Sequence, residues 1–286
     1  MIVRIVVVAM LGGVAPFPSQ TVRAQTPDAS LIEEAFTYAI PISEIMRLRW
    51  LYVEGSNNPS RGVNTIAHGR DLVDHRRRAV TMPNNDTLYS RSFLDLSGGP
   101  VQIHAPDIND RYYSVAFYDI FTNNFASIGR RLTGTREGDF LVVGPEWDKA
   151  LPEGARTIRS PSNDVLVLTR IAVDGEADLP AARAAQDGVR VSPLVNQSSA
   201  RPKGFAPKAG DVATFLSTVN QALAANAVPT FERPLLERFA RVGICGEKCS
   251  WGNLPAEVQA TWIQHFPTLP ASLKKPIAGD SKPVND

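Results

Sequence analysis

The chain has 286 residues, of which 43% are hydrophobic and 21% are charged, so it can bury a core and is not a disordered chain. Its length suits one large domain, or one domain with an appendage. The formal net charge of +1 argues against a nucleic-acid partner, which would require a basic face.

The first 24 residues have the layout of a secretory signal peptide. A short positive start ends at Arg4, an apolar run covers residues 5–15, and Val22-Arg23-Ala24 resembles a small-residue cleavage site before Gln25. The apolar run is too short to anchor the chain in a bilayer. We therefore expect a soluble mature protein that begins near Gln25, has no transmembrane anchor, and is periplasmic or secreted.

The next segment has a helical pattern. Ser30-Leu-Ile-Glu33 is a capping-box sequence, which is typical of a helix start. Apolar residues then recur at helical spacing: Ala35, Phe36, Ala39, Ile42, Ile45 and Met46. Pro41 interrupts this stripe, so the pattern predicts a kinked helix over 31–52.

From Ala79 onward the apolar period becomes that of a strand. Within 88–95 one side carries Leu88, Ser90, Ser92 and Leu94, and the other carries Tyr89, Arg91, Phe93 and Asp95. Further predicted strands are 101–104, 111–118, 140–143, 157–159 and 165–171, and the stretch from Asn123 to Arg131 is interpreted as a loop. Short strands separated by turn residues predict a mainly β fold, an antiparallel sandwich or jelly roll, rather than parallel α/β.

Helical patterns return near the end of the chain, over 212–223, 235–239 and 258–263. The predicted organisation is therefore a signal peptide at 1–24, a β-sandwich domain with an N-terminal helix at 25–245, and a C-terminal helical appendage and tail at 246–286.

The two cysteines, Cys245 and Cys249, are separated by three residues. A redox-active pair usually has two residues between its cysteines, and metal chelation would need further ligands nearby. In an exported protein this spacing favours a local structural disulfide.

Familiar catalytic motifs are missing from the sequence. It contains no GxSxG elbow, Walker loop or dinucleotide fingerprint. Its four histidines form no HxH or HExxH pair, so no metal site is predicted. No cofactor can be identified from the residues.

A set of polar motifs carries a resemblance to a known family. In chain order they are His68, Pro83-Asn-Asn-Asp-Thr-Leu-Tyr-Ser90, Asp95-Leu-Ser97, Arg111-Tyr-Tyr113, Asp119, Asn123-Asn-Phe-Ala-Ser-Ile-Gly129, Arg131-Leu-Thr-Gly134 and Gly144-Pro-Glu-Trp147. Together they resemble the pattern of the domain of unknown function 1254 family, over about residues 30–245. The Asn-Asp-Thr-Leu-Tyr core is the most specific of these motifs.

The resemblance implies a β-sandwich of jelly-roll type with flanking helices, in bacterial proteins that are often exported. It implies no reaction. Many members of the family continue into a second domain, of unknown function 1214, and we expect no such domain in this chain. A site built between those two domains therefore does not carry over to this chain.

The same motifs supply the candidate site residues. Candidates for catalysis are Asp86, Tyr89, Arg111 and His68. Candidates for ligand binding are Asn84, Asn85, Asp119, Asn123 and Arg131. Asparagine and aspartate are also ordinary turn residues, and an arginine at a strand start is usually a solvated end, so each candidate has a purely structural alternative.

Three hypotheses for the function stay open at this point. The first is an enzyme, a hydrolase or lyase that acts on a small organic molecule, with Asp86 as general acid or base. The second is a module that binds a small, anionic or polar molecule or a carbohydrate without chemistry. The third is a structural protein in which the polar motif organises turns and a homo-oligomer interface.

Overall fold

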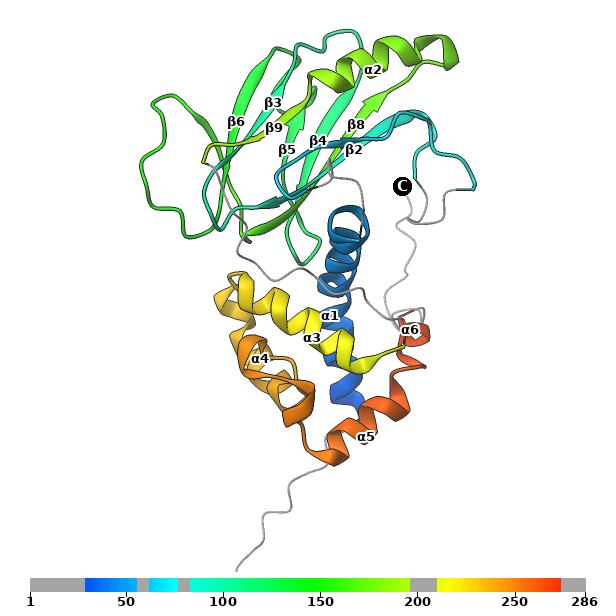
Figure 1. The fold of residues 1–286 in the computed structure, drawn as a ribbon, viewed down its shortest axis with the longest axis vertical. Helices are drawn as coiled ribbons and strands as arrows, with labels where there is room; N and C mark the ends of the chain where they lie inside the picture. Colours follow the sequence, from blue (N-terminus) through cyan, green and yellow to red (C-terminus); the bar gives the residue numbers. More distant parts are fainter. Residues whose placement is uncertain (1–28, 56–61, 77–82, 196–209, 274–286) are drawn as a thin grey trace, which may run out of the picture.

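The computed structural model describes residues 29–55, 62–76, 83–195 and 210–273 (Figure 1). The predicted signal peptide and its cleavage site at Gln25 lie outside these residues. Among the described residues, no helix has both the length and the apolar character needed to cross a membrane.

The first described element is helix α1 (Ala29–Arg49), which continues into a π-helical turn (Trp50–Glu54). The predicted helix over 31–52 is confirmed, and Pro41 lies inside it. Its apolar stripe is buried, with Ile32, Ala35, Ala39 and Ile42 fully shielded from solvent. The stripe therefore gives α1 one face for packing.

Two β-sheets form the next part of the molecule. The five-stranded sheet is antiparallel and has the order β1 (Ala67–His68), β2 (Thr87–Asp95), β8 (Asp164–Ala172), β4 (Tyr113–Tyr118), β5 (Asn124–Gly129). The four-stranded sheet has the order β7 (Arg156–Arg159), β6 (Gly138–Val143), β3 (Val101–Ala105), β9 (Arg190–Pro193), and only β6 and β7 run parallel within it. Every strand predicted from the sequence is present.

Several elements differ from the prediction or were absent from it, among them β5, β9 and helix α2 (Leu179–Gly188). Strand β5 occupies most of the stretch that was interpreted as a loop, because its Asn124 and Gly129 resemble turn residues while its backbone pairs with β4. Strand β9 and helix α2 were not predicted. Only Ala182 and Gln186 of α2 are buried, so the helix adds little apolar surface to the core.

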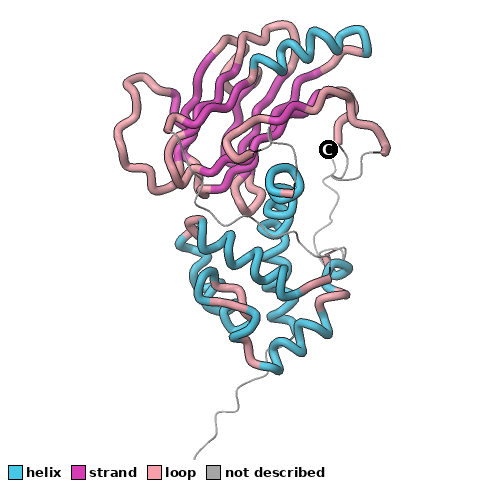
Figure 2. The backbone as a smooth tube through the Cα atoms, viewed as in Figure 1, coloured by secondary structure: helices cyan, strands magenta, loops and turns pink. Residues whose placement is uncertain are grey.

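The two sheets share one hydrophobic core, which also receives α2. Leu88 and Val167 of the five-stranded sheet and Ile103 and Val142 of the four-stranded sheet are within it, each at most 1% exposed. This pattern confirms a mainly β fold with two sheets and several helices. Figure 2 shows the strands gathered in one part of the molecule, with α2 against them.

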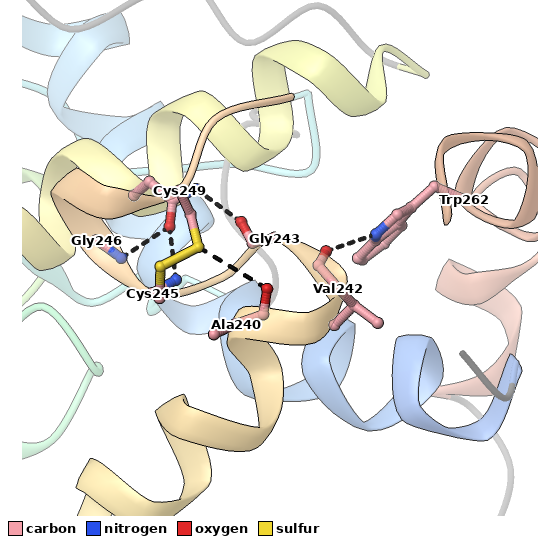
Figure 3. The surroundings of a disulfide bond; sticks show 8 residues. Ala240, Val242, Gly243, Cys245, Gly246, Cys249 and Trp262 are labelled. Carbon is pink, nitrogen blue, oxygen red and sulfur yellow. Dashed lines mark hydrogen bonds between the residues drawn. A yellow bond between two sulfur atoms is a disulfide. The ribbon is translucent and has the colours of Figure 1, made fainter. Parts of the chain in front are cut away.

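A second core is entirely helical. It joins α1 to α3 (Val212–Ala225), α4 (Arg233–Phe239), α5 (Ala256–His265) and α6 (Leu269–Ser272), and all the predicted C-terminal helices are present. Its centre contains Trp262, which is fully buried and donates its indole N–H to the carbonyl oxygen of Val242 at 2.8 Å (Figure 3). The helices form a body beside the sheets, and α1 extends from it toward them (Figure 1).

The predicted disulfide between Cys245 and Cys249 is present in this helical body (Figure 3). It closes a ring around the 3₁₀ turn Gly246–Lys248. Asn220 of α3 supports the ring, because its side-chain oxygen accepts hydrogen bonds from the backbone N–H groups of Cys245 (3.0 Å) and Gly246 (2.9 Å). The disulfide therefore fixes a turn against α3 and lies away from the sheets.

Candidate functional site

A cavity of about 500 Å³ lies on the face of the five-stranded sheet that points away from the shared core. Its floor comes from β2, β8 and β4, and its walls come from the end of α1, the π-helical turn and the loops near residues 70 and 84. The lining residues are Leu48, Tyr52, Gly69, Arg70, Asp71, Val73, Pro83, Asn84, Tyr89, Arg91, Phe93, Tyr112, Ser114, Leu166, Leu168 and Arg170. A cavity of this size suits a small organic molecule.

Strand alternation decides which side chains reach this cavity. Successive residues of a strand point to opposite faces, so Leu88 and Leu94 enter the core while Tyr89, Arg91 and Phe93 face the cavity. The sequence predicted this division of β2 correctly. In β8 the same alternation brings Leu166, Leu168 and Arg170 to the cavity floor.

Arginine–tyrosine stacks are the main polar feature of the cavity. The guanidinium carbon of Arg91 lies 4.1 Å from the ring centre of Tyr52, and that of Arg170 lies 5.7 Å from the ring centre of Tyr89. Such contacts contribute about 0.5–2 kcal/mol each, depending on exposure. They also hold the planar guanidinium groups in defined orientations, which favours recognition of a planar anion.

Arg170 is the cation of the cavity floor that pairs with Tyr89 across the strands. It is half-buried, it lines the cavity, and it forms no ion pair with any residue that the structure describes. A partly desolvated cation without a counter-ion raises the free energy of the empty site. An anion bound beside Arg170 would remove that cost.

The other charged wall residues are already paired with α2. Arg70 forms an ion pair with Asp187 and donates to the side-chain oxygen of Gln186 at 3.0 Å. Asp71 accepts from Arg183 at 3.2 Å. These contacts tie the loop near residue 70 to α2, so this wall of the cavity is attached to the sheet body.

The opposite wall is held by a buried ion-pair network. Arg49 donates to Asp164 at 2.6 Å and to Glu54 at 3.0 Å, and the amide of Asn226 donates to Asp164 at 2.8 Å. Arg49 and Glu54 flank the π-helical turn, and Asp164 begins β8. The network therefore fixes Tyr52, which belongs to that turn, above the strand that supplies the floor.

Two of the predicted site residues, Tyr89 and Asn84, line the cavity. The backbone N–H of Asn84 donates to the hydroxyl oxygen of Tyr89 at 2.8 Å. The Pro83-Asn84 step thus bends back over the strand that it precedes and orients the tyrosine ring. Because this bond uses the oxygen of Tyr89 as acceptor, its hydroxyl proton stays available for a ligand.

Asn85 and Asp86 do not line the cavity, and both are exposed. The carbonyl oxygen of Asp86 accepts from the backbone N–H of Val173 at 2.9 Å, directly beside the first pair of the β2–β8 ladder. In this position Asp86 extends the strand pairing, which agrees with the alternative that it is a turn residue at the start of β2.

Arg111 lies outside the cavity lining. Its guanidinium donates to Asp110 and to Asp178, at 2.7 Å in each case, and the contact with Arg111 holds the pKa of Asp178 below its usual range. Arg111 therefore links the start of β4 to the turn that precedes α2.

Asp119 and Asn123 build the turn between β4 and β5. One carboxylate oxygen of Asp119 accepts from the backbone N–H groups of Phe121 and Asn123, each at 2.9 Å, and the other accepts from the amide of Asn123 at 3.1 Å. Arg131 is exposed and does not line the cavity. Its guanidinium carbon lies 5.7 Å from the ring centre of Tyr112, which is a lining residue.

His68 also lies outside the lining. Its Nδ1 is 2.8 Å from the hydroxyl oxygen of Ser90, which also accepts from the amide of Gln186 at 3.0 Å. Burial lowers the pKa of His68, and the nearby positive charge of Arg70 lowers it further. The histidine belongs to a polar cluster under α2, on the core side of β2.

The sequence analysis did not select Arg91, Arg170 or Tyr52 as site residues. Their signal was present in part, since Arg91 stands on the polar side of the predicted alternation of β2. The pairing of β2 with β8, which puts Tyr89 opposite Arg170, joins segments that are far apart in the chain. No local pattern contains that information.

Comparison with known proteins gives a family and a fold. A family model described as "Protein of unknown function (DUF1254)" matches residues 63–193. No curated protein matches the chain. The crystal structure of the VPA0106 protein from Vibrio parahaemolyticus is similar, with a TM-score of 0.68 and 20% identity over 86% of this chain. The alignment covers 59% of that protein, so this chain spans less than two thirds of its length.

An uncharacterized protein from Burkholderia cenocepacia is a weaker match, with a TM-score of 0.30 and 11% identity over 46% of this chain and 34% of that one. The likeness to the Vibrio structure concerns the fold alone. The matched segment contains β2, β4 and β8, which together supply the cavity floor. The similarity to the DUF1254 family is thus carried by residues 63–193, less than half of the chain.

Proposed function

We propose that this chain binds a small organic anion in the cavity on the outer face of the five-stranded sheet. The observation that carries the proposal is Arg170, a half-buried cation that lines the cavity and has no counter-ion among the described residues. Arg91 supplies a second guanidinium from a diagonal position of the β2–β8 ladder, and the backbones of such diagonal residues are about 7–8 Å apart. Both side chains are long enough to reach one anionic group.

Binding without chemistry is favoured over a hydrolase or lyase. Asp71 is the only carboxylate among the lining residues, and Arg183 pairs with it. No histidine belongs to the lining. A general acid or base needs a titratable group within hydrogen-bond reach of the ligand, and besides tyrosine this set of lining residues provides only the ion-paired Asp71.

Two further parts of the prediction belong to the same proposal. The shared core of the two sheets supports a β-sandwich, and we place it in the jelly-roll class. The Cys245–Cys249 disulfide supports export to the periplasm or beyond, since disulfides persist in oxidising compartments. Exported material should begin near Gln25, and an intact mass that retains Met1 would contradict the export.

The anion site can be tested with one charge-removing variant. Calorimetric titration with small carboxylates and their matched neutral amides should show binding of the carboxylates only. Arg170→Gln should weaken that binding at least tenfold, because it removes a charge-assisted hydrogen bond. Arg190→Gln makes the same charge change at an exposed position of β9, and it should leave the affinity unchanged.

Equal affinity for acids and amides, or equal losses in Arg170→Gln and Arg190→Gln, would contradict the anion site. Circular dichroism of both variants should match that of the parent protein, since neither arginine forms an ion pair among the described residues.

A further inference from the structure

The cavity floor changes from polar to apolar along its length. The β2–β8 register gives three successive outward-facing pairs: Tyr89 with Arg170, Arg91 with Leu168, and Phe93 with Leu166. The first pair combines a hydroxyl and a cation, the second combines a cation and an alkyl side chain, and the third is entirely apolar. The cavity therefore has two chemically different ends.

The walls follow the same gradient. Asn84 lies at the Tyr89 end, where its N–H contacts the tyrosine hydroxyl, and Ser114 of β4 is paired with Arg170. Leu48 belongs to the last turn of α1, next to Arg49, which contacts Asp164 at the far end of the floor. The apolar end is thus closed by an apolar wall, and the polar end by groups that form hydrogen bonds.

The length of this gradient follows from strand geometry. Residues 89 and 93 are four positions apart, which is about 13 Å along an extended strand. A compact anion would occupy only the polar end and leave the half-buried Leu168 and Leu166 uncovered. A longer ligand with one charged end would match both ends at once.

We propose that the ligand is an unbranched alkyl carboxylate, with its carboxylate at Arg170 and Tyr89 and its alkyl chain along the floor toward Phe93 and Leu166. This inference rests on the proposed anion site. Arg170 offers two parallel N–H groups to the carboxylate, and the hydroxyl of Tyr89 donates a third hydrogen bond. The alkyl chain replaces water over the half-buried Leu168 and Leu166, which is favourable in proportion to the apolar area covered.

The test is a titration series with butanoate, hexanoate, octanoate and decanoate, with octan-1-ol as the neutral analogue and benzoate as the compact anion. Kd should fall about fourfold for each methylene that enters the apolar end. Octanoate should bind more tightly than both octan-1-ol and benzoate.

Two variants separate the two ends of the cavity. Arg170→Gln should weaken every acid in the series by a similar factor. Leu166→Asn should flatten the chain-length dependence and leave the Kd of butanoate unchanged. Leu166→Ala is a milder second variant, in case asparagine disturbs the strand, and it should reduce the gain per methylene at the end of the chain.

The outcomes distinguish this inference from the proposed function. If all the acids bind with the same Kd and Arg170→Gln weakens them all, the anion site stands and the alkyl ligand is wrong. Tighter binding of benzoate than of octanoate would also overturn the alkyl ligand and leave the anion site in place. If no acid binds, or if octan-1-ol binds as well as octanoate, the anion site itself is wrong.

Discussion

The two faces of the five-stranded sheet are made by the same strands but have different chemistry. On the core face, Leu88 and Val167 are at most 1% exposed and pack against the other sheet. On the cavity face, Arg91 and Arg170 stack on tyrosine rings and are only half-buried. Because neighbouring residues of one strand point to opposite faces, stability and ligand binding should be separable by substitutions only one residue apart.

The largest effect is expected at Arg49, because this residue contributes both to the stability of the fold and to the wall of the ligand cavity. Arg49→Met should destabilise the fold by about 3–5 kcal/mol, because it leaves Asp164 and Glu54 as buried carboxylates without their partner. It should also weaken ligand binding, since the π-helical turn that carries Tyr52 loses its anchor. Urea denaturation measures the first effect, and calorimetric titration measures the second.

Arg47→Met is the matched control for Arg49. Arg47 lies on the same helix, and its one ion pair among the described residues is an exposed i,i+3 contact with Glu44. Its replacement should cost less than about 1 kcal/mol and leave binding unchanged. Equal losses in the two variants would show that the buried network does not hold the wall of the cavity.

The sharpest comparison uses one substitution on each face. Leu88→Ala, on the core face, should cost about 2–5 kcal/mol because it opens a cavity in a close-packed core. Leu168→Ala, on the cavity face, should cost only about 1 kcal/mol, since Leu168 is half-buried and already borders open space.

Binding should show the opposite order of effects. Leu168→Ala should weaken the binding of an alkyl acid, and Leu88→Ala should not, when both are measured well below their unfolding temperatures. A larger loss of stability in Leu168→Ala would mean that the cavity face belongs to the core.

A smaller effect concerns pH and the core-side histidine. His68 has a lowered pKa in the folded protein, while in the unfolded chain it titrates near about 6.5. As the pH falls below that value, the unfolded state binds the proton first, so the free energy of unfolding decreases until the folded pKa is reached. In His68→Gln this part of the pH dependence should disappear.

The measurement is urea denaturation of the parent protein and of His68→Gln from pH 8 down to pH 5. The difference between the two proteins should be constant near pH 8 and should change below about pH 6.5. A constant difference across the whole range would contradict the role assigned to burial. Ligand affinity should be the same in both proteins at pH 8, since His68 does not line the cavity.

The smallest effect is expected for Asp86→Asn. Asp86 is exposed, lies outside the cavity, and contributes its carbonyl oxygen to the strand ladder, which asparagine preserves. Stability should change by less than about 0.5 kcal/mol, and ligand affinity should not change. Tyr89→Phe is the variant to compare with Asp86→Asn, because it keeps the ring that stacks with Arg170 and removes only its hydroxyl group from the cavity. A loss of binding in Asp86→Asn alone would move the site from the cavity to the turn.

Local patterns in the sequence were sufficient where a segment's own residues decide its structure. The alternation from Leu88 to Asp95, the stripe of α1 and the cysteine spacing all predicted what is observed. The same logic failed for β5, where Asn124 and Gly129 resemble turn residues but pairing with β4 decides the conformation. It also failed for α2, whose ten residues include four alanines and Leu179 as the one large apolar residue.

The candidate site was harder to predict, because it depends on which strands are neighbours. The polar motif correctly indicated Tyr89 and Asn84. It also suggested Asp86 and Arg111, whose observed contacts are a strand ladder and a pair of aspartates. The cation that carries the proposal, Arg170, reaches Tyr89 only through the β2–β8 register, and that register is set by the packing of the whole sheet.

The two cores also differ in how far apart in the sequence their residues lie. The core of the sheets is made from Leu88 to Val189, whereas the helical core joins α1 to helices near the other end. Tyr38 donates to Glu232 across 194 positions of the chain. During synthesis, which runs from the N-terminus, α1 is therefore made first and buried last. The sheets can assemble before the C-terminal helices that bury the apolar stripe of α1 have been synthesised. The cavity wall contributed by α1 is therefore the final part of the site to form.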